Sequence, residues 1–280
     1  LSDAESSQLA TDARMRFAML SSEMALALTS SLLNTAESTG HTGWVIDLET
    51  AYAPINPGAV GTATATQKAR GYWPTRGPSP YGLWMPALHI RKGLPFSFEL
   101  GARSIYVSQT ETLACQLEVK WTLHEGMPSI YSPDVAIRFA GTRLLGNRDW
   151  DLSMFDLDLI VSREFPLGGV IKLTPYGAFK MTWMSSESGV MDFGPTRPAG
   201  TANPTSPTEV TKSQTLFPEL AYGPHNFQRY LVGLRMTTYL ISLGIEGNFF
   251  PGQTFGASRD YPRYAVKQAF SAAFRLGLEF

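Results

Sequence analysis

The stretch Phe270-Ser-Ala-Ala-Phe-Arg-Leu-Gly-Leu-Glu-Phe280, at the end of the chain, decides the fold. Every second residue from Phe270 to Phe280 is apolar, whereas the residues between them include Arg275 and Glu279. This alternation is typical of a β-strand with one apolar and one polar face. The stretch also has the roughly 9–11 residues that a tilted strand needs to cross a bilayer. It therefore indicates either a membrane-spanning strand or a half-buried strand of a soluble sandwich.

The composition favours many strands and turns. Charged residues are only 17% of the 280, and the chain contains 25 Gly and 19 Pro, which points away from a helical protein. No run of about 18 apolar residues occurs, which excludes a helical membrane span. A barrel is compatible with the mean hydropathy of −0.08, because its alternation hides apolar residues from any average. A net charge of −1 gives no sign of a nucleic-acid partner, and the single cysteine, Cys115, excludes a disulfide framework.

Period-two alternation recurs from residue 43 onward and predicts ten strands. We expect them at 44–52, 81–91, 96–108, 112–124, about 130–141, 151–163, 170–184, 227–237, 239–250 and 264–280. The boundary near Thr237 has no Gly or Pro, but a single strand over 227–250 would be far too long for a membrane. Pro86 and Pro175 lie inside expected strands, where a bulge or a shifted boundary would accommodate them.

The expected connections are asymmetric. Long segments (54–80, 185–226 and 251–263) follow odd-numbered strands, and short turns follow even-numbered ones. Short periplasmic turns and long external loops are the usual arrangement in membrane barrels. The outward-facing aromatic residues then form two girdles: Trp44, Phe96, Trp121, Tyr239 and Phe280 at the periplasmic edge, and Tyr52, Trp84, Tyr106, Trp183, Tyr230, Phe249 and Tyr264 at the outer edge.

An aromatic residue that closes the last strand resembles the C-terminal signature of bacterial outer-membrane β-barrels, where it guides assembly. The resemblance covers about residues 43–280 and is generic to that class. It implies an integral position in a bacterial outer membrane, in contact with lipids and lipopolysaccharide, with both termini periplasmic. It also implies that the barrel-assembly machinery recognises the strand ending in Phe280. The predicted fold is thus a ten-stranded antiparallel up-and-down transmembrane β-barrel over 43–280.

Residues 1–42 form a separate N-terminal part. A capping box, Ser2-Asp-Ala-Glu5, begins a predicted helix over 3–33. Its apolar residues recur at three- and four-residue steps: Leu9, Ala13, Phe17, Leu20, Met24 and Leu28. The helix could cap the barrel mouth, lie at the periplasmic interface, dock on a partner or plug the lumen. A plug is the less expected arrangement, because side chains already fill the interior of small barrels.

The inward positions of the strands carry nearly balanced charges. The predicted lumen network consists of Glu49, Glu99, Arg103, Glu118, Lys120, Arg138, Asp156, Asp158, Lys172, Lys180, Arg235, Glu246 and Arg275. Charges in a narrow interior are stable only when they are paired. Two interpretations remain open: a packed salt-bridge network that closes the barrel, or the polar lining of a narrow or gated channel.

Three classes of function compete. The chain resembles the omptin proteases in strand count, and those proteases carry acidic pairs and a His-Asp couple on the extracellular rim. The candidate rim residues here are Asp149 and Asp151, with Asp192, His225 and Asp260 in loops. No matching His-Asp pair and no metal-spaced motif occurs, so we expect no enzyme, no cofactor and no metal. We instead expect a non-enzymatic barrel that anchors or scaffolds an envelope assembly, with a partner on the N-terminal helix or loop 185–226. A narrow or gated channel is the alternative, and a rim-sited hydrolase is the least expected.

Overall fold

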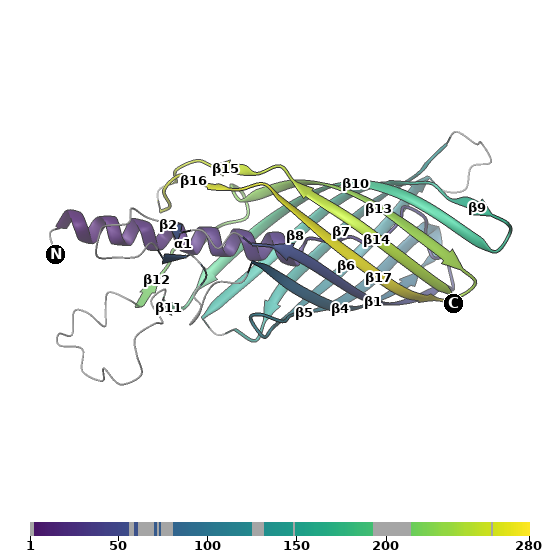
Figure 1. Ribbon diagram of the computed structural model, residues 1–280, viewed down its shortest axis with the longest axis horizontal. Helices are drawn as coiled ribbons and strands as arrows, with labels where there is room; N and C mark the ends of the chain where they lie inside the picture. The colour runs from purple at the N-terminus through teal and green to yellow at the C-terminus, as the bar shows by residue number, and fades with distance from the viewer. Residues whose placement is uncertain are drawn as a thin grey trace.

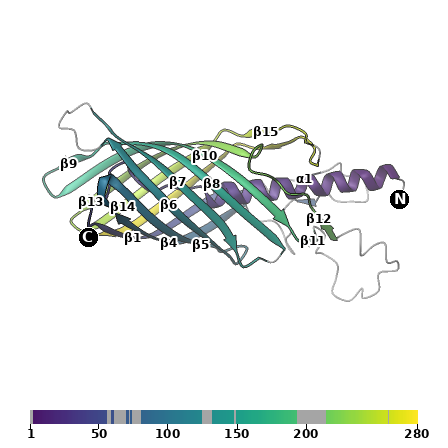
Figure 2. The ribbon, with the colours of Figure 1, turned by 180° about the vertical axis from the view of Figure 1, so that it is seen from behind.

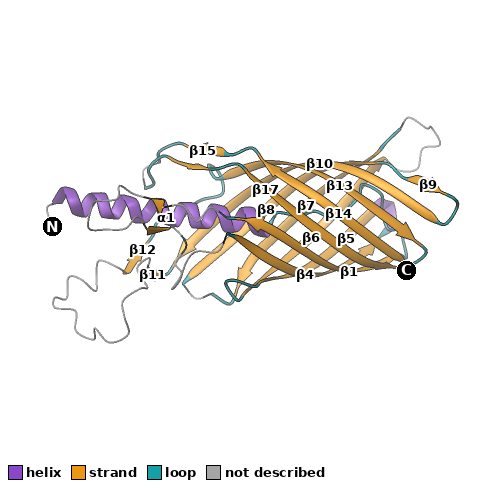
Figure 3. Ribbon diagram, viewed as in Figure 1, coloured by secondary structure: helices purple, strands orange, loops and turns teal. Residues whose placement is uncertain are grey.

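The protein forms a closed antiparallel β-barrel with one long helix, as the computed structural model shows (Figures 1 and 3). The structure describes residues 3–55, 59–60, 70–71, 73, 81–124, 132–147, 149–192, 214–258 and 260–280. The barrel strands are β1 (Trp44–Pro54), β4 (Gly82–Gly93), β5 (Phe98–Val107), β6 (Thr112–His124), β7 (Asp134–Leu145), β8 (Trp150–Ser162), β10 (Ile171–Ser188), β13 (Asn226–Thr238), β14 (Ile241–Phe250) and β17 (Ala269–Glu279). The predicted ten-stranded barrel is therefore confirmed.

Each barrel strand pairs with the barrel strands before and after it, and β17 pairs with β1 to close the cylinder. Closure removes the free sheet edge over the paired length of β1 and β17. The backbone of Phe280 also continues this seam, because Trp44 and Phe280 exchange two hydrogen bonds of 2.6 and 2.9 Å. The last strand thus contributes to closing the barrel with its final residue.

The wall is apolar outside and charged inside, the reverse of a soluble protein. Leu117 and Val232 are 69% and 71% exposed, whereas Arg91 and Arg138 are each 1% exposed. Strict alternation causes this separation, since successive side chains of a strand point to opposite faces. A continuous belt of exposed apolar side chains is the surface that a bilayer covers.

Short strand pairs extend the end of the barrel where the long connections lie. They are β2 (Ala59–Val60) with β3 (Arg70–Gly71), β11 (Val190–Asp192) with β12 (Gln214–Leu216), and β15 (Gln253–Phe255) with β16 (Tyr264–Val266). We call this end the loop mouth and the opposite end, where Phe280 lies, the turn mouth (Figure 2). At the turn mouth, β9 (Phe165–Leu167) pairs with the start of β10, and a 3-10 helix, Pro95–Ser97, precedes β5.

The predicted strand boundaries need several corrections. The strand expected at about 130–141 is Asp134–Leu145, and the strand expected at 170–184 continues to Ser188. The strand expected over 264–280 is divided, because β16 pairs with β15 before β17 begins at Ala269. The strand expected over 96–108 begins at Phe98, after the 3-10 helix. The uncertain boundary near Thr237 is confirmed: β13 and β14 are separate strands, and Tyr239 in the turn has a φ of 48°.

Neither internal proline requires a bulge. Pro86 pairs with Thr50 of β1, and the pairing of β4 with β5 begins only at Ala87. Pro175 pairs with Leu234 of β13, and the pairing of β10 with β8 begins only at Tyr176. Pro175 therefore lies where β8 has ended, and Pro86 lies outside the ladder of β4 with β5, so the missing N–H disrupts little of either ladder.

The N-terminal helix α1 (Asp3–Leu28) is shorter than expected and lies differently. It ends at Leu28, and residues 29–39 continue as non-helical chain through the barrel to β1 at the turn mouth. The even number of strands does place the start of β1 and the end of β17 at one mouth. The passage through the lumen nevertheless brings the helix out at the loop mouth, so the two chain ends lie at opposite ends of the molecule (Figure 1). The expectation that both termini share one side is therefore wrong.

In the part of the chain that the structure describes, no helix is both long enough and apolar enough to cross a bilayer. The C-terminal half of α1 is buried in the loop-mouth half of the barrel, where Phe17, Met24 and Leu28 are at most 2% exposed. The inward side chains there are apolar and often small, including Ala51, Ala53, Ala87 and Ala114. Small inward residues leave the space that a helix about 10 Å wide requires.

Candidate functional site

The interior of the turn-mouth half is a dense network of charged side chains. Buried acidic and basic residues of the barrel strands are equal in number, with seven of each: Asp47, Glu49, Glu99, Glu118, Asp156, Asp158 and Glu246 against Arg91, Arg103, Lys120, Arg138, Lys180, Arg229 and Arg275. Moving an unpaired ion into such an interior costs several kcal/mol. The equal numbers therefore indicate that the wall charges neutralise one another.

The register of the sheet places opposite charges face to face. Arg138 of β7 lies opposite Asp158 of β8, and the two side chains are 2.7 Å apart. Lys180 of β10 lies opposite the same aspartate, at 3.7 Å. Glu99 of β5 lies opposite Lys120 of β6, at 3.3 Å. Direct cross-strand neighbours have the shortest separation between side chains in a sheet, so strand pairing itself assembles these ion pairs.

These pairs join into two chains of contacts around the lumen. In the first, His89 lies between Glu49 at 2.9 Å and Glu118 at 3.2 Å, and Glu118 also binds Arg138. The Glu49 carboxylate is 2.7 Å from Arg103. In the second, Asp47 bridges Arg91 and Arg275, at 2.7 Å from each. Glu279 then links Arg275 at 2.9 Å to Arg235 at 2.6 Å.

Residues 29–39, which we call the lumen segment, run through the centre of this network. Asn34 is its main point of contact: its side-chain oxygen accepts from Arg91 at 2.7 Å and from Lys120 at 3.0 Å, and its amide donates to Glu99 at 3.0 Å. Ser31 accepts from Arg103 at 2.6 Å. A single amide side chain can serve both charge signs because it carries a donor and an acceptor. The lumen segment is thus joined to the charged wall from several sides.

The backbone of the lumen segment is satisfied by wall side chains in place of secondary structure. The Glu246 carboxylate accepts from the amides of Leu32 and Leu33, each at 2.8 Å, where Leu33 has a φ of 50°. The carbonyl of Leu33 accepts from Arg275 at 2.9 Å, and that of Ala36 accepts from Thr122 at 2.7 Å. Buried backbone polar groups need such partners. The extended chain can therefore pass through an interior too narrow for a helix.

The end of the helix inside the barrel is also bonded to the wall. Arg229 donates to the carbonyl of Leu26 at 2.9 Å and to the Thr29 hydroxyl, and Lys180 donates to the carbonyl of Thr29 at 3.1 Å. Cations are favourable at a helix C-terminus, where the backbone carbonyls carry partial negative charge. The last turn of the helix has no basic residue of its own, so two strands supply its cations.

At the loop mouth, aromatic residues pack around the helix. The ring of Phe17 stacks on Phe217 at 4.9 Å, and Trp73 donates to Glu23 at 2.7 Å. Tyr264 stacks on Phe255 at 4.9 Å and contacts Ser22 at 3.4 Å. Burial raises the pKa of Tyr264. These contacts hold the helix on the side of the mouth that carries β15 and β16.

Most predicted lumen residues lie where the alternation placed them, with one exception. Lys172 is 55% exposed and pairs with Glu164 at 2.9 Å. The cause is that β10 extends past the end of β8 at the turn mouth, so Lys172 lies beyond the enclosed interior. Arg235 lies at the edge of the network, with a side chain 13% exposed.

Most of the girdle residues lie on the outer face. Tyr52 opposes Trp84 near the loop mouth, Trp183 lies 5.9 Å from Phe155, and Trp121 stacks on Phe98 at 5.6 Å near the turn mouth. The exposed members also include Trp44, Tyr106, Tyr230, Tyr239, Phe249 and Phe280. The prediction that Tyr264 belongs to the outer girdle is wrong. Tyr264 is 4% exposed, because β16 folds over the helix and turns the ring inward.

The sequence reasoning missed Arg229 and the lumen segment. Arg229 has the same parity as Arg235 on β13, so the alternation alone could have identified it. The plug was the least expected place for residues 1–42, yet residues 17–36 are almost all buried. The small inward residues of the loop-mouth half, such as Ala51 and Ala87, were the available signal of unfilled space.

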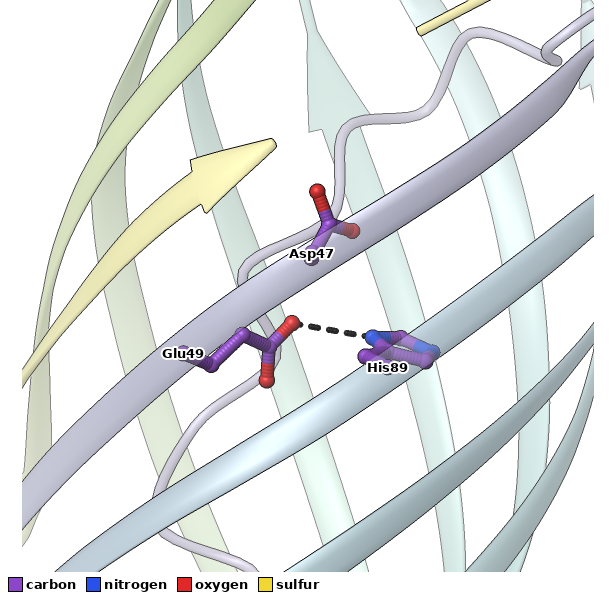
Figure 4. A group of neighbouring side chains, drawn as sticks. All are labelled: Asp47, Glu49 and His89. Atoms are coloured by element: carbon purple, nitrogen blue, oxygen red, sulfur yellow. Dashed lines mark hydrogen bonds and ion pairs between the residues drawn. The ribbon is translucent and has the colours of Figure 1, made fainter. Parts of the chain in front are cut away.

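Asp47, Glu49 and His89 form a cluster with the geometry of a metal site. Their ligand atoms lie within 4.8 Å of one another, on β1 and β4 (Figure 4). Both carboxylates are already neutralised by guanidinium groups, since Asp47 contacts Arg91 and Arg275, and Glu49 contacts Arg103. A divalent cation would have to compete with these three charges, so the cluster belongs to the ion-pair network.

The contacts of the described residues join His225 to neither Asp149 nor Asp151. Asp151 binds the exposed Arg143, and Asp149 is exposed beside it. His225 is 6% exposed between aromatic rings, and its Nδ1 donates to the carbonyl of Ala221 at 2.9 Å. Burial lowers the pKa of His225. Among the described residues the carboxylates bonded to a histidine are Glu49 and Glu118, deep in the lumen.

No protein-family model matches the sequence, and no curated protein matches it. Among solved structures, the outer-membrane protease OmpT from Escherichia coli aligns at 8% identity over 89% of this chain and 99% of its own, with a TM-score of 0.38. The translocator domain of the autotransporter NalP from Neisseria meningitidis aligns at 10% identity over 86% and 89%, with a TM-score of 0.36. OprG from Pseudomonas aeruginosa aligns at 8% identity over 88% and 99%, with a TM-score of 0.30. The likeness to these outer-membrane proteins is one of barrel fold alone.

Proposed function

We propose that the protein is an integral, non-enzymatic barrel of a bacterial outer membrane, closed to solutes, that anchors or scaffolds an envelope assembly. One observation carries the proposal: the chain's own residues 17–39 occupy the barrel interior, held by a charge-balanced network. A barrel that fills its lumen in this way is built for rigidity. Its exposed apolar belt and aromatic residues at both edges support the membrane location.

The network argues against free conduction. An ion passing through would meet Arg91, Lys120 and Glu99 already engaged with one another and with Asn34. Breaking a buried ion pair by removing a partner costs about 3–5 kcal/mol. A gated channel would need the lumen segment to leave, which breaks many of these contacts together.

The projecting helix supports the anchoring part of the proposal. α1 continues past the barrel at the loop mouth, beside β15 and β16 (Figure 1). We place the turn mouth and Phe280 on the periplasmic side, where the barrel-assembly machinery would recognise the last strand, and the helix on the outer side. A partner would then bind the helix or loop 185–226, of which residues 193–213 lie outside the described part of the chain.

A non-enzymatic role is supported by the rim. Asp151 forms an exposed ion pair with Arg143, whereas the ring of His225 stacks with Phe255 and Tyr264. We expect the Asp149→Asn and His225→Ala variants to retain every envelope phenotype of the parent. Loss of a hydrolytic activity in either variant would move the proposal to the enzyme class.

Planar-bilayer conductance tests the closed lumen. We expect the full chain to be silent and a variant lacking residues 1–40 to show discrete openings, because deletion removes the lumen segment and leaves the charged wall. Steady openings of the full chain that disappear in Arg103→Ala or Glu118→Ala would establish the narrow channel instead.

A pulldown from native outer membrane tests the scaffold role. A stable partner that is lost on deleting residues 1–40 supports this role.

A further inference from the structure

The barrel wall opens beside the helix, at the seam between the first and last strands. Pairing of β1 with β17 ends at Tyr52 and Ala272, whereas β17 continues along β14 to Ala269. Residues 53–54 of β1 and 269–271 of β17 therefore have no pairing with each other. A cavity of about 480 Å³ lies at this gap. Its lining includes the outward-facing Phe270 and the inward-facing Asn248, so the cavity connects the outer face with the interior.

Most of the cavity is apolar. Its lining includes Leu26 and Ala27 of the helix, Ala53 at the gap, Ile55 just after β1, and Phe250 of β14. Its volume lies in the range of about 300–1,000 Å³ that small-molecule sites occupy. Apolar cavities of this kind with a few polar groups are the usual form of a ligand site.

One buried charge in the lining has no carboxylate of the described residues in direct contact with it, although Asp156 and Asp158 act on it at longer range. Arg229 is 1% exposed and lines the cavity, and its Nε has no hydrogen-bond partner within the described part of the chain. It is the exception among the seven buried wall cations, because the described residues place no carboxylate within 4 Å of it. The helix carbonyl and hydroxyl that it contacts carry only partial charge.

The charges around the cavity favour an anion. The lining contains two cations, Arg229 and the exposed Lys267, and one carboxylate, Glu23. The Glu23 carboxylate accepts a hydrogen bond from Trp73 at 2.7 Å. The lining therefore carries one excess positive charge. A guanidinium forms its strongest hydrogen bonds with carboxylate and phosphate oxygens.

We propose that this lateral cavity binds an amphiphilic anion, an acyl chain with one anionic group, with its chain between the helix and the β1–β17 gap and its anionic group at Arg229. The gap admits such a molecule from the membrane side of the wall, where Phe270 is 63% exposed. The anionic group can be the carboxylate of a free fatty acid or the phosphate of a lipid. The inference adds a ligand to the barrel and does not depend on its scaffolding role.

Photo-crosslinking tests the site. The full-length protein is placed in phosphatidylcholine nanodiscs with a palmitate that carries a diazirine near the end of its chain. We expect covalent adducts on the peptides that contain Ala53–Ile55 and 269–271, which unlabelled palmitate suppresses and hexadecanol does not. Suppression by phosphatidylglycerol as well would identify a lipid phosphate as an accepted anion, whereas suppression by palmitate alone would identify the free acid.

Three variants distinguish the contribution of the Arg229 charge from that of the cavity volume, and a fourth variant is the control. Arg229→Met should lower adduct yield about tenfold or more, because a charge-assisted bond is lost, and Arg229→Lys should restore part of it. Ala53→Phe fills the cavity but keeps the cation, so it should also lower the yield if the barrel folds normally. Arg143→Met, the same substitution on the exposed rim, should change nothing. Equal suppression by hexadecanol, or adducts that persist unchanged in Arg229→Met and Ala53→Phe, would overturn the proposal.

Discussion

Asn34 connects the two parts of the molecule, since it lies on the lumen segment and contacts three charged wall residues. Asn34→Leu would leave Arg91, Lys120 and Glu99 with unmet hydrogen bonds in a buried site. We predict a loss of about 3 kcal/mol in the free energy of unfolding, measured by urea titration of the protein in phospholipid vesicles. Asn147→Leu is the matched control, because Asn147 lies in an exposed turn, and its effect should stay within about 0.5 kcal/mol. Equal effects of the two substitutions would contradict the role given to Asn34.

His225 should make the loop mouth sensitive to acid. Burial lowers the pKa of this histidine below its ordinary value of about 6.5, so the folded state favours the neutral ring. The neutral ring's contribution to the free energy of unfolding is complete above the ordinary pKa. This contribution is lost as the pH falls through the lowered pKa of the folded state. We predict that acidification below about pH 6 loosens the stack of His225 with Phe255 and Tyr264, seen as weaker near-ultraviolet circular dichroism. His225→Phe keeps the stack without a titrating group, so a transition that persists in this variant would refute the assignment.

The pairing of β10 with β13 depends on a glycine beneath an aromatic ring. Tyr176 lies directly opposite Gly233, and a Cβ added there would be 2.2 Å from the ring. Gly233→Ala must therefore displace Tyr176 and weaken the 2.7 Å bond from its hydroxyl to Glu246. We predict a loss of about 2 kcal/mol in the free energy of unfolding. Gly177→Ala is the control on the neighbouring strand, since its added Cβ approaches no atom closer than 3.7 Å; a similar loss there would rule out the ring contact as the cause.

Strands were predictable from sequence because lipid and lumen impose period two on every strand. Leu117 and Glu118 show the rule in adjacent residues: the first is 69% exposed and the second 4%. The pattern did not explain the two prolines inside strands. The register does, because each proline lies outside the ladder with one of its two neighbouring strands. Register depends on pairing between distant strands, which a single strand's pattern does not contain.

The helix was predictable as an element but its place was not. An apolar stripe such as Phe17, Leu20 and Met24 looks the same whether it faces a membrane surface, a partner or a barrel interior. The non-helical lumen segment gave no periodic signal at all, because its bonds go to wall side chains far along the chain, such as Glu246. The charged residues could be predicted individually from the alternation. Their arrangement around Asn34 could not, because the contacting residues lie far apart in the sequence.

The molecule as a whole is a cylinder whose interior is occupied by residues 17–39 of the same chain. Strand pairing assembles the ion pairs of the wall, and the ion pairs hold the lumen segment, which in turn fixes the helix at the loop mouth. The interior therefore has two layers, an apolar one that accepts a helix and a charged one that accepts only extended chain. This division explains both how the chain fills the lumen and why the lateral cavity lies beside the helix.

Oxygen and nickel-chelate accessibility of a nitroxide on Leu117→Cys, in a Cys115→Ala background and in lipid vesicles, tests the inside-out wall most directly. Leu117 is near the middle of β6 on the outer face, and Ser108→Cys in the exposed turn after β5 provides the aqueous reference. We predict that the label on residue 117 collides readily with oxygen and is shielded from the nickel chelate, whereas the label on residue 108 shows the opposite. A label on residue 117 that is as accessible to the nickel chelate as the one on residue 108 would contradict a lipid-facing wall.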